Sequence, residues 1–372
     1  MELKINREVL YEGIQRTLGI VEKRTIMPIL NNVLIKAANN KITIAATNRE
    51  ISLIADYDAE VVTAGDITLS ARKLYEMIRE VQGEVLHMRL NDANWIHIDC
   101  DKAHFRIPGI SADDYPKIAE DEEISFFKVS GKILLDMINK TFFAMSTDET
   151  RVNLNGTLFE TEKADEHLFL KMVATDGHRL ALAGADTDLG DFIPPEKGMI
   201  IPRKGIAEIR KIVEGDEGIL EFGIRQGFCV IRKSNIVLKV SLIDSDYPDY
   251  KRVVALEEGV SVELDREKFL RALRRMGVMS SEKYSGVKIK IHENKILLNS
   301  NNPDVGEASD EIDISVGGKE FEVGYNVHYL IDAVEALQEK NIILEIREGL
   351  KPGTIRPVKG QDYLCVIMPL KM

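Results

Sequence analysis

The sequence predicts an α+β protein built from three copies of one unit, each with two helices packed on antiparallel sheets. Two observations carry this prediction. Short landmarks recur at nearly constant spacing: Ala46–Asn48 returns as Ala174–Asp176 after 128 residues, and Asp114–Pro116 returns as Asp246–Pro248 after 132. Each copy also repeats the same order of strand and helix patterns. Internal repetition of this kind, in layers of helix and sheet, is typical of repeated α+β domains.

A further landmark pair and a more divergent third copy support the repeat. The segments Leu69–Leu74 and Ile201–Ile206 are again 132 residues apart. In the third copy, Ser300–Pro303 takes the place of the Ala-Thr-Asp turn and Tyr325–Leu330 takes the place of the basic segment. The spacing predicts three domains, at residues 1–122, 123–254 and 255–372.

Each unit is predicted to begin with a strand, as at 126–129 and 260–264, and to continue into an amphipathic helix. In the segment 265–277, Phe269, Leu270, Leu273 and Met276 fall on one face at helical spacing. Alternating apolar and polar residues predict further strands, for example at 41–45 and 288–292. The loop Gly349–Gly360, with two prolines, predicts a flexible hairpin tip. Helices are expected over residues 7–18, 70–81, 128–143, 202–213, 265–277 and 326–339.

The distribution of charge matters more than its total. The chain has 49 Lys and Arg against 61 Asp and Glu, a net charge of −12, which by itself disfavours nucleic-acid binding. The six expected helices, however, carry a net charge of +6 and the rest of the chain −18. This segregation favours a polyanion facing the helices, although merely solvated helix faces remain an alternative. The last helix departs from the pattern, with Asp332, Glu335 and Glu339.

Cysteine usage and hydropathy indicate a cytoplasmic protein. Cys100, Cys229 and Cys365 are scattered and form no CxxC pair, which argues against a disulfide scaffold or zinc ribbon and for a reducing compartment. The longest stretch without Asp, Glu, Lys or Arg has 11 residues, Thr25–Ile35, whereas a membrane span needs about 20. The chain begins directly with periodic sequence rather than with a signal peptide. We therefore expect no membrane association.

Two segments could carry chemistry or binding. In Val173–Leu182, Asp176 and His178 could serve as an orienting carboxylate and a base, but no nucleophile can be assigned to them. The repeat indicates a turn between strands there, so a binding surface is favoured over a purely structural turn, and both over catalysis. Residues 363–367 predict a final strand. Beyond it lie the apolar residues Met368, Pro369, Leu370 and Met372, as suits adaptable peptide binding. No GxxxxGK[ST], GxGxxG, HExxH or GxSxG motif is present.

At this point the sequence resembles the bacterial DNA polymerase III beta subunit, the sliding clamp, along its whole length. The segments that carry the resemblance are ATDGHRLAL at 174–182, IPRKG at 201–205, DYPDYKRV at 246–253, GYNVHYL at 324–330 and the closing VIMPLKM. The resemblance implies a ring of two three-domain protomers, joined head to tail, that encircles duplex DNA and tethers the replicative polymerase. It implies no catalytic residue, cofactor or metal. Its implied partners are primed double-stranded DNA, the polymerase III alpha subunit, the clamp loader, and other polymerases and repair proteins that bind through linear motifs.

Simple geometry agrees with a dimeric ring. Helices pack about 8–10 Å apart, so six helices lining one closed chain would leave an opening of roughly 7 Å. Twelve helices from two chains would leave roughly 24 Å, enough for a duplex with water around it. A closed dimer would hold DNA by topology and could slide along it.

The resemblance also implies three groups of site residues. The partner-peptide cleft would comprise Leu154, Thr175, Gly177, His178, Arg179, Leu180, Pro248, Arg252, Val253, Asn326, Tyr329, Val366, Met368, Pro369, Leu370 and Met372. Its apolar members would receive Leu or Phe anchors, and Arg179 and Arg252 would hold polar or acidic ends. Phosphate contacts would come from Arg24, Arg72, Lys73, Arg203 and Lys204. The dimer seam would place Phe105 and Ile107 against Val278 and Met279, with Glu307, Asp310 and Glu311 facing Arg72, Lys73 and Arg106.

Two other functions stay open at this level. An enzyme using Asp176 and His178 would lose turnover when His178 is replaced, yet still bind partner peptides. An acidic peptide-binding scaffold without DNA encirclement would not associate with primed DNA in a salt-dependent way.

Overall fold

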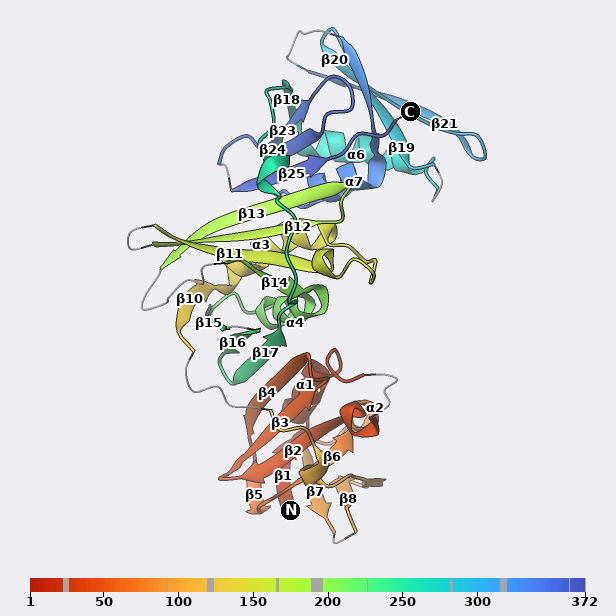
Figure 1. The fold of residues 1–372 in the computed structure, drawn as a ribbon. Coiled ribbons are helices and arrows are strands. Elements are labelled where there is room, and N and C mark those ends of the chain that lie inside the picture. Colours follow the sequence, from red (N-terminus) through yellow and green to blue (C-terminus); the bar gives the residue numbers. More distant parts are fainter. Residues whose placement is uncertain are drawn as a thin grey trace. The chain divides into compact units, whose positions relative to one another are not determined.

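A computed structural model describes residues 1–22, 27–91, 93–118, 124–164, 167–188, 197–225, 227–281, 284–314, 320–360 and 362–371. These residues form two compact units (Figure 1). One contains residues 1–118, 124–131 and 207–242, and the other contains residues 132–188, 197–206 and 243–371, each without the residues outside the described ranges. Arg24 and Met372, which the sequence assigned to DNA contact and to the cleft, lie outside the described residues, as does the predicted boundary at 122.

The first repeat has the expected two helices. They are α1 (Arg7–Thr17) and α2 (Ala71–Glu80). Its strands are β1 (Glu2–Asn6), β2 (Asn32–Ala38), β3 (Lys41–Thr47), β4 (Ile51–Asp58), β5 (Glu60–Thr63), β6 (Gly65–Ser70), β7 (Val85–Leu90), β8 (Trp95–Cys100) and β9 (Ala103–Pro108). Two 3₁₀ turns, η1 (Pro28–Asn31) and η2 (Ala112–Asp114), precede β2 and follow β9.

The second and third repeats follow the same plan. The central repeat contains β10 (Phe126–Ser130), α3 (Gly131–Thr141), η3 (Phe142–Ala144), η4 (Val152–Leu154), β11 (Gly156–Ala164), β12 (His167–Thr175), β13 (Arg179–Asp188), β14 (Met199–Pro202), α4 (Arg203–Val213), β15 (Ile219–Arg225), β16 (Phe228–Lys233) and β17 (Ile236–Ser241). A short helix, α5 (Lys251–Val254), lies in the link that follows. The C-terminal repeat contains β18 (Val260–Asp265), α6 (Arg266–Gly277), β19 (Gly286–His292), β20 (Lys295–Asn302), β21 (Gly306–Asp313), β22 (Phe321–Asn326), α7 (Val327–Glu335), β23 (Asn341–Ile346), β24 (Gly353–Pro357) and β25 (Tyr363–Ile367).

The structure confirms the α+β fold and all six expected helices, with three local corrections. Residues Lys128–Ser130 belong to strand β10, so the helix predicted from 128 begins at Gly131, where the strand alternation ends. The helix predicted over 326–339 ends at Glu335. The predicted flexible tip at 349–360 is wrong in its middle, because Gly353–Pro357 forms strand β24, paired between β23 and β25 and largely buried. Neighbouring strands therefore override the local Pro and Gly signal.

Polar side chains at the ends of the preceding strands determine where the helices start. Asn6 Oδ1 accepts a hydrogen bond from the Glu8 N–H at 2.9 Å, at the start of α1. Asp265 and Asn326 cap α6 and α7 in the same way. Such capping satisfies backbone N–H groups that have no partner inside the helix. In the described residues no helix is long and apolar enough to span a membrane.

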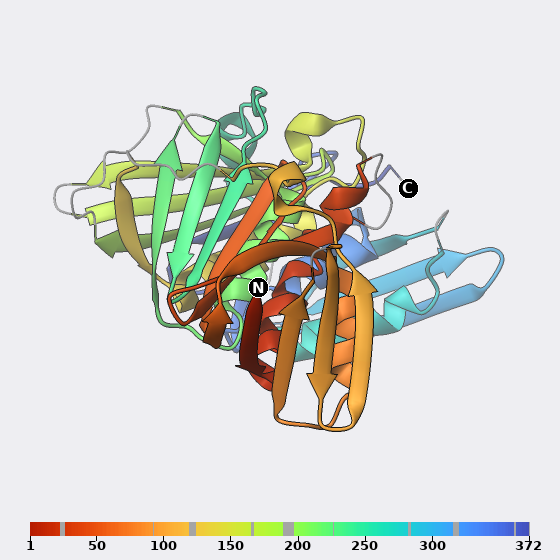
Figure 2. The ribbon, with the colours of Figure 1, turned by 90° about the horizontal axis from the view of Figure 1, so that it is seen from below.

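Two eight-stranded antiparallel sheets each join strands of neighbouring repeats. One has the order β10-β15-β16-β17-β4-β3-β2-β6, and the other β14-β11-β12-β13-β25-β24-β23-β18. In the first sheet β17 pairs with β4, so that the green strands of the central repeat continue into the red and orange strands of the first (Figures 1 and 2). In the second sheet β13 pairs with β25. Each junction between repeats is therefore made by backbone hydrogen bonds.

Two smaller sheets have exposed edges. Their orders are β5-β1-β7-β8-β9 and β21-β20-β19-β22. Strand β9 is thus an edge strand in one compact unit, and β21 is an edge strand in the other. An edge strand presents unpaired backbone groups that can pair with another chain.

The repeated turn is the same in atomic detail in the first two copies. Thr47 Oγ1 accepts from the Arg49 N–H at 3.0 Å, and Thr175 Oγ1 accepts from the Gly177 N–H at 3.0 Å. In each copy the next side chain, Asn48 or Asp176, accepts from the backbone N–H groups two and three residues later. The landmark found in the sequence is therefore a specific β-turn between adjacent strands.

Candidate functional site

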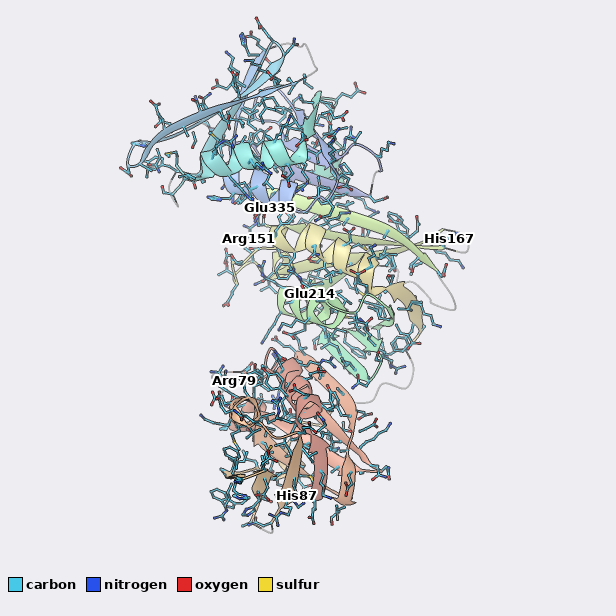
Figure 3. All side chains as sticks on the ribbon, turned by 180° about the vertical axis from the view of Figure 1, so that it is seen from behind. Arg79, His87, Arg151, His167, Glu214 and Glu335 are labelled. Atoms are coloured by element: carbon cyan, nitrogen blue, oxygen red, sulfur yellow. The ribbon has the colours of Figure 1, made fainter. Side chains whose placement is uncertain are left out.

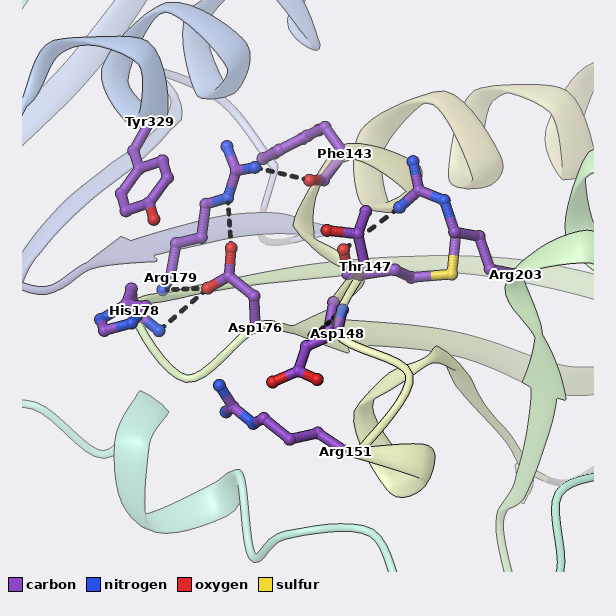
Figure 4. Close-up of a pocket in the computed structure, with 11 residues that line it drawn as sticks. Phe143, Thr147, Asp148, Arg151, Asp176, His178, Arg179, Arg203 and Tyr329 are labelled. Carbon is purple, nitrogen blue, oxygen red and sulfur yellow. Dashed lines mark hydrogen bonds and ion pairs between the residues drawn. The ribbon is translucent and has the colours of Figure 1, made fainter. Parts of the chain in front are cut away.

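A polar pocket lies at the end of strands β12 and β13, beside helix α7 (Figure 4). Its volume is about 390 Å³. It is lined by Phe143, Met145, Ser146, Thr147, Asp148, Arg151, Asp176, His178, Arg179, Arg203 and Tyr329. All of these residues belong to one compact unit. The structure thus brings together the turn at 176–178 and the first turn of α7, which are about 150 residues apart in sequence.

Arg179 is the centre of this pocket and is almost fully buried, with 11% of its side chain exposed. Its Nε donates to Asp176 Oδ2 at 3.0 Å, its Nη1 to Asp332 Oδ2 at 2.5 Å, and its Nη2 to the Phe143 carbonyl at 2.7 Å. The guanidinium also lies over the rings of Phe143 and Tyr329, at 5.2 and 4.4 Å from their centroids. Burial alone would lower the pKa of Arg179, but the hydrogen bond and charge of Asp332, with those of Asp176, raise it.

The contacts of Asp176 and His178 do not form a catalytic pair. Asp176 accepts hydrogen bonds from the backbone N–H groups of His178 and Arg179 and from the Arg179 side chain. The His178 ring instead stacks on Tyr329, with ring centroids 6.4 Å apart and planes inclined by 22°. A general base needs an orienting partner on its ring, and here the carboxylate holds the turn. The geometry favours a binding surface over catalysis by Asp176 and His178.

The predicted apolar members of the cleft divide into buried and accessible residues. Leu180 and Val366 belong to a core cluster with Leu158, Val173, Ile200 and Tyr250, and are less than 5% exposed. Leu154 is also buried. Val253, Met368 and Leu370 are between 37% and 40% exposed. The accessible apolar surface therefore comes from α5 and from the segment after β25, while Leu180 and Val366 support it from the core.

The remaining predicted cleft residues have recognisable local roles. Thr175 Oγ1 donates to the Arg179 carbonyl at 2.6 Å, and Gly177 has a φ of +87°, so both shape the turn. Asn326 caps α7. Arg252 is highly exposed and pairs with Asp249 at 2.8 Å. Pro248 is exposed and Pro369 half-buried.

Sequence reasoning missed the far wall of the pocket, which comes from residues 143–151. Asp148 Oδ1 accepts from the Thr150 N–H and hydroxyl, which forms a compact polar loop. The guanidinium of Arg151 from this loop lies against Gly177, where a Cβ would be 2.5 Å from Nη2. The Ser-Thr-Asp-Glu-Thr run is a turn signal, but its pairing with the 176–178 turn depends on tertiary structure.

The basic residues expected to meet DNA differ in how free they are. Arg72 and Lys204 are exposed on α2 and α4. Lys73 pairs with Glu76 at 2.8 Å. Arg203 turns into the pocket, where Nη1 donates to the Met145 carbonyl at 3.2 Å and the guanidinium lies over Phe142. Burial and the neighbouring charge of Arg179 lower the pKa of Arg203. Arg203 is thus engaged within the protein rather than being a free phosphate ligand.

Three arginines of helix α6, the most basic of the six expected helices by count, are paired with carboxylates within the chain. Arg271 pairs with Glu267 at 2.6 Å, and Arg274 pairs with Glu335 of α7 at 2.6 Å. Figure 3 labels Glu335 on the ribbon. Arg275 donates through Nε to Asp310 of β21 at 2.7 Å. Of the acidic residues that stood out in the last predicted helix, Asp332 therefore balances Arg179 of β13 and Glu335 balances Arg274 of α6.

The residues expected at a dimer seam lie on or beside the two edge strands. Phe105 and Ile107 are half-buried on β9, and Val278 is 69% exposed just after α6, next to the half-buried Met279. Glu307 is exposed on β21, whereas Asp310 is already paired with Arg275. Glu311 pairs with Lys295, and Arg106 lies over Trp95 at 4.3 Å.

Within the described ranges, no group of three or more His, Cys, Asp or Glu side chains is arranged to hold a metal ion.

Fold and site together define a binding protein made of three α+β repeats, and comparisons with known proteins identify its class. The family models for the N-terminal, central and C-terminal domains of the DNA polymerase III beta subunit match residues 1–119, 128–249 and 251–371, respectively. The beta sliding clamp of Caulobacter vibrioides is 30% identical over the full length of both chains, and that of Escherichia coli is 27% identical over the full length of both.

Solved structures give the same result. The Caulobacter crescentus beta sliding clamp aligns with a TM-score of 0.94 at 30% identity and covers 100% of this chain and 99% of its own. The DNA polymerase III beta subunit of Pseudomonas aeruginosa aligns with a TM-score of 0.92 at 27% identity and covers both chains completely. The chain belongs to the DNA polymerase III beta subunit family, the sliding clamps. It is accordingly a non-catalytic processivity factor that tethers the polymerase in DNA replication.

Proposed function

We propose that two copies of this chain close head to tail into a ring around duplex DNA, with β9 of one protomer pairing with β21 of the other. The observation that carries this proposal is the pair of edge strands. Strand β9 exposes His104 and Arg106, whereas β21 carries Glu307, Asp310, Glu311 and Asp313. Opposite charges on two unpaired edges favour their association and disfavour pairing of either edge with itself.

Apolar contacts would reinforce the seam. Phe105 and Ile107 of one protomer would pack against Val278 and Met279 of the other, which would cover the exposed Val278 side chain. Because Asp310 is held by Arg275, Glu307 is the better candidate for a charge pair with Arg106 of the partner. The domains of each protomer would comprise residues 1–122, 123–254 and 255–372.

Duplex DNA would be contacted through phosphates without base recognition. Arg72 and Lys204 are the cations that are both exposed and unpaired among the described members of the predicted set, and we assign them this role with Arg24. Lys73 and Arg203 would contribute to the local potential while remaining engaged with Glu76 and Met145. Few free cations in this predicted set keep the electrostatic attraction weak, as sliding requires.

Partner proteins would dock short linear motifs in the cleft formed by the turn at 176–178, α5, the first turn of α7 and the segment after β25. Leu or Phe anchors would contact Val253, Met368 and Leu370 above the buried Leu180 and Val366. The polymerase III alpha subunit, the clamp loader, and other polymerases and repair proteins would compete for this surface.

Three buried free thiols support a place in the reducing cytoplasm.

Topological retention on DNA tests the ring. The protein is loaded with its clamp loader on a nicked circular duplex, the circle is cut once, and bound protein is followed by gel filtration. Loss from the linear form with retention on the circle is the expected result, because an encircling ring slides off a free end. Equal retention on both forms would mean that direct contacts hold the protein, and would refute encirclement.

The seam is tested by sedimentation of variants at the two edges. Phe105→Arg places a charge in the proposed apolar contact, and should raise the dimer dissociation constant by at least tenfold. Val62→Arg is a matched control, because Val62 is 57% exposed on β5 at the opposite edge of the same sheet. An unchanged dimer in Phe105→Arg would place the interface elsewhere.

A further inference from the structure

Arg179 connects two repeats through a single side chain. It begins β13 of the central repeat, and Asp332, which accepts from its Nη1, lies on α7 of the C-terminal repeat. The other two donor groups go to Asp176 and to the Phe143 carbonyl, both in the central repeat. Asp332 is therefore the carboxylate through which α7 holds this guanidinium.

Asp332 and Tyr329 are placed to act together. They lie three residues apart on α7, and residues at this spacing share one face of a helix. The Arg179 guanidinium pairs with Asp332 and also lies 4.4 Å from the Tyr329 ring centroid, while Tyr329 stacks on His178 (Figure 4). His178 in turn accepts a hydrogen bond at its carbonyl from the Met368 N–H at 2.9 Å. A chain of contacts thus runs from Asp332 through Arg179 and Tyr329 to the accessible wall of the cleft.

Asp332 also determines the charge that the cleft presents. Arg179 is 11% exposed and contacts two carboxylates, so its positive charge is balanced inside the protein. The sequence suggested that Arg179 would hold an acidic end of a partner, but its Nε, Nη1 and Nη2 groups are already engaged within the protein. Removing the negative charge of Asp332 would leave Asp176 as the one paired carboxylate and would weaken the hydrogen bond from Nη1, so that a ligand could compete for this donor.

We propose that Asp332 is a positioning and specificity-determining residue of the partner-motif cleft. It holds Arg179 against Tyr329, which fixes the Tyr329–His178 wall that a motif contacts. By balancing the charge of Arg179, it also lets the cleft select apolar anchors without preference for an acidic neighbour. This inference rests on the proposed motif-binding role of the same cleft.

The test compares two labelled peptides on the full-length protein by fluorescence anisotropy. Both peptides carry the same Leu and Phe anchors, and they differ at one position beside the anchors, which is Asn in one and Asp in the other. The variants are Asp332→Asn, which keeps the shape and removes the charge, and Asp332→Glu, which keeps the charge. Glu335→Gln is the matched control, because Glu335 is on the same helix and pairs with Arg274 instead.

Asp332→Asn should weaken the Asn peptide by about five- to tenfold, the effect of losing a charged hydrogen bond that supports the wall. The Asp peptide should weaken less, so that the ratio of the two affinities shifts towards the acidic peptide by at least threefold, most strongly at low salt. Asp332→Glu should restore the wild-type ratio, and Glu335→Gln should leave both affinities unchanged.

Three results would overturn the proposal. The first is an Asp332→Asn protein that behaves like Glu335→Gln. The second is an equal loss of affinity for both peptides, which would indicate a merely structural contribution. If Asp332→Asn does not fold, Asp332→Glu takes its place, and a changed ratio of the two affinities in Asp332→Glu would then count against the charge argument. The third is failure of the wild-type protein to bind either peptide, which would refute the cleft itself and is distinguished by being independent of residue 332.

Discussion

Leu180 of β13 lies directly opposite Val366 of β25 in adjacent antiparallel strands. The two residues come from different repeats and are both buried, at 3% and 1% exposure. Ile51 of β4 and Val240 of β17 form the corresponding pair at the other junction. Because continuous sheets cross both junctions, the described structure divides into two compact units rather than three, and strands of the central repeat contribute to both.

The two copies of the repeated turn differ in backbone strain. Gly177 has a φ of +87°, and its counterpart Arg49 has a φ of +76°. The left-handed region costs an L-residue about 1–2 kcal/mol, a cost that glycine avoids. Glycine's greater freedom in the unfolded chain offsets part of this gain in stability. Arg49→Gly should therefore raise the free energy of unfolding by about 0.5–1 kcal/mol in urea titrations. The converse change, Gly177→Ala, should lower it and displace Arg151; a stability loss in Arg49→Gly would contradict this reasoning.

A buried hydroxyl in the C-terminal repeat is a second test of packing. Tyr325 is fully buried and its Oη has no hydrogen-bond partner among the described residues, while a Cβ on Gly353 would lie 2.4 Å from it. Tyr325→Phe should stabilise the protein by about 1 kcal/mol, because a buried unpaired hydroxyl is costly. Gly353→Ala should destabilise by about 1–3 kcal/mol alone and by less in the Tyr325→Phe background. Strict additivity in a double-mutant cycle would argue against the predicted clash.

The pairing of arginines on α6 predicts which basic side chains contribute to the salt dependence of DNA binding. Arg72→Ala and Lys204→Ala should each reduce the slope of log affinity against log salt for a short duplex by about 0.9, the value for one phosphate contact. Arg275→Ala should leave the slope nearly unchanged, because Arg275 is paired with Asp310. Fluorescence anisotropy over a KCl series measures all three. A slope that fell as much for Arg275→Ala as for Arg72→Ala would show that the intrachain pair opens for DNA.

Buried thiols predict an alkaline limit to stability. Burial raises the pKa of both Cys229 and Cys365 from 9.0 to about 12. A group whose pKa is raised by folding stabilises the folded state fully below its unfolded pKa, so this contribution should persist below pH 9 and be lost as the pH rises towards 12. Above pH 9 each thiol should therefore lower the free energy of unfolding by about 1.4 kcal/mol per pH unit. Urea titrations between pH 8 and 10 measure it, with a Cys229→Ala/Cys365→Ala protein as control.

Thiol labelling provides an independent check of the same burial. At pH 8 neither Cys229 nor Cys365 should react with a thiol reagent in the native protein, and both should react promptly in urea. Rapid native labelling of Cys365 would indicate that β25 opens locally, contrary to its position inside an eight-stranded sheet.

Much of the architecture could be predicted from the sequence, because it depends on local and periodic signals. The offset of Thr47 and Thr175 marked the repeat, and the spacing of Phe269, Leu273 and Met276 marked a helix. The prediction failed where neighbouring strands decided the outcome. Gly353–Pro357 has a loop-like composition, yet it pairs on both sides as β24. Lys128–Ser130 similarly extends β10 because it pairs with β15.

For the site, local sequence was enough to predict which residue types gather at the repeated turn and which apolar residues follow the last strand. How these residues are used depends on contacts between distant parts of the chain. Arg179 could be placed in the cleft from its motif, but its ion pair with Asp332 joins positions 153 residues apart, which no local pattern encodes. Similarly, the charges of α6 and α7 could be counted from the sequence, whereas the pairing of Arg274 with Glu335 depends on a distance of 2.6 Å between side chains of the two helices. Periodicity along the chain determines the helices and strands. The pairing of charges between them is determined by how they pack.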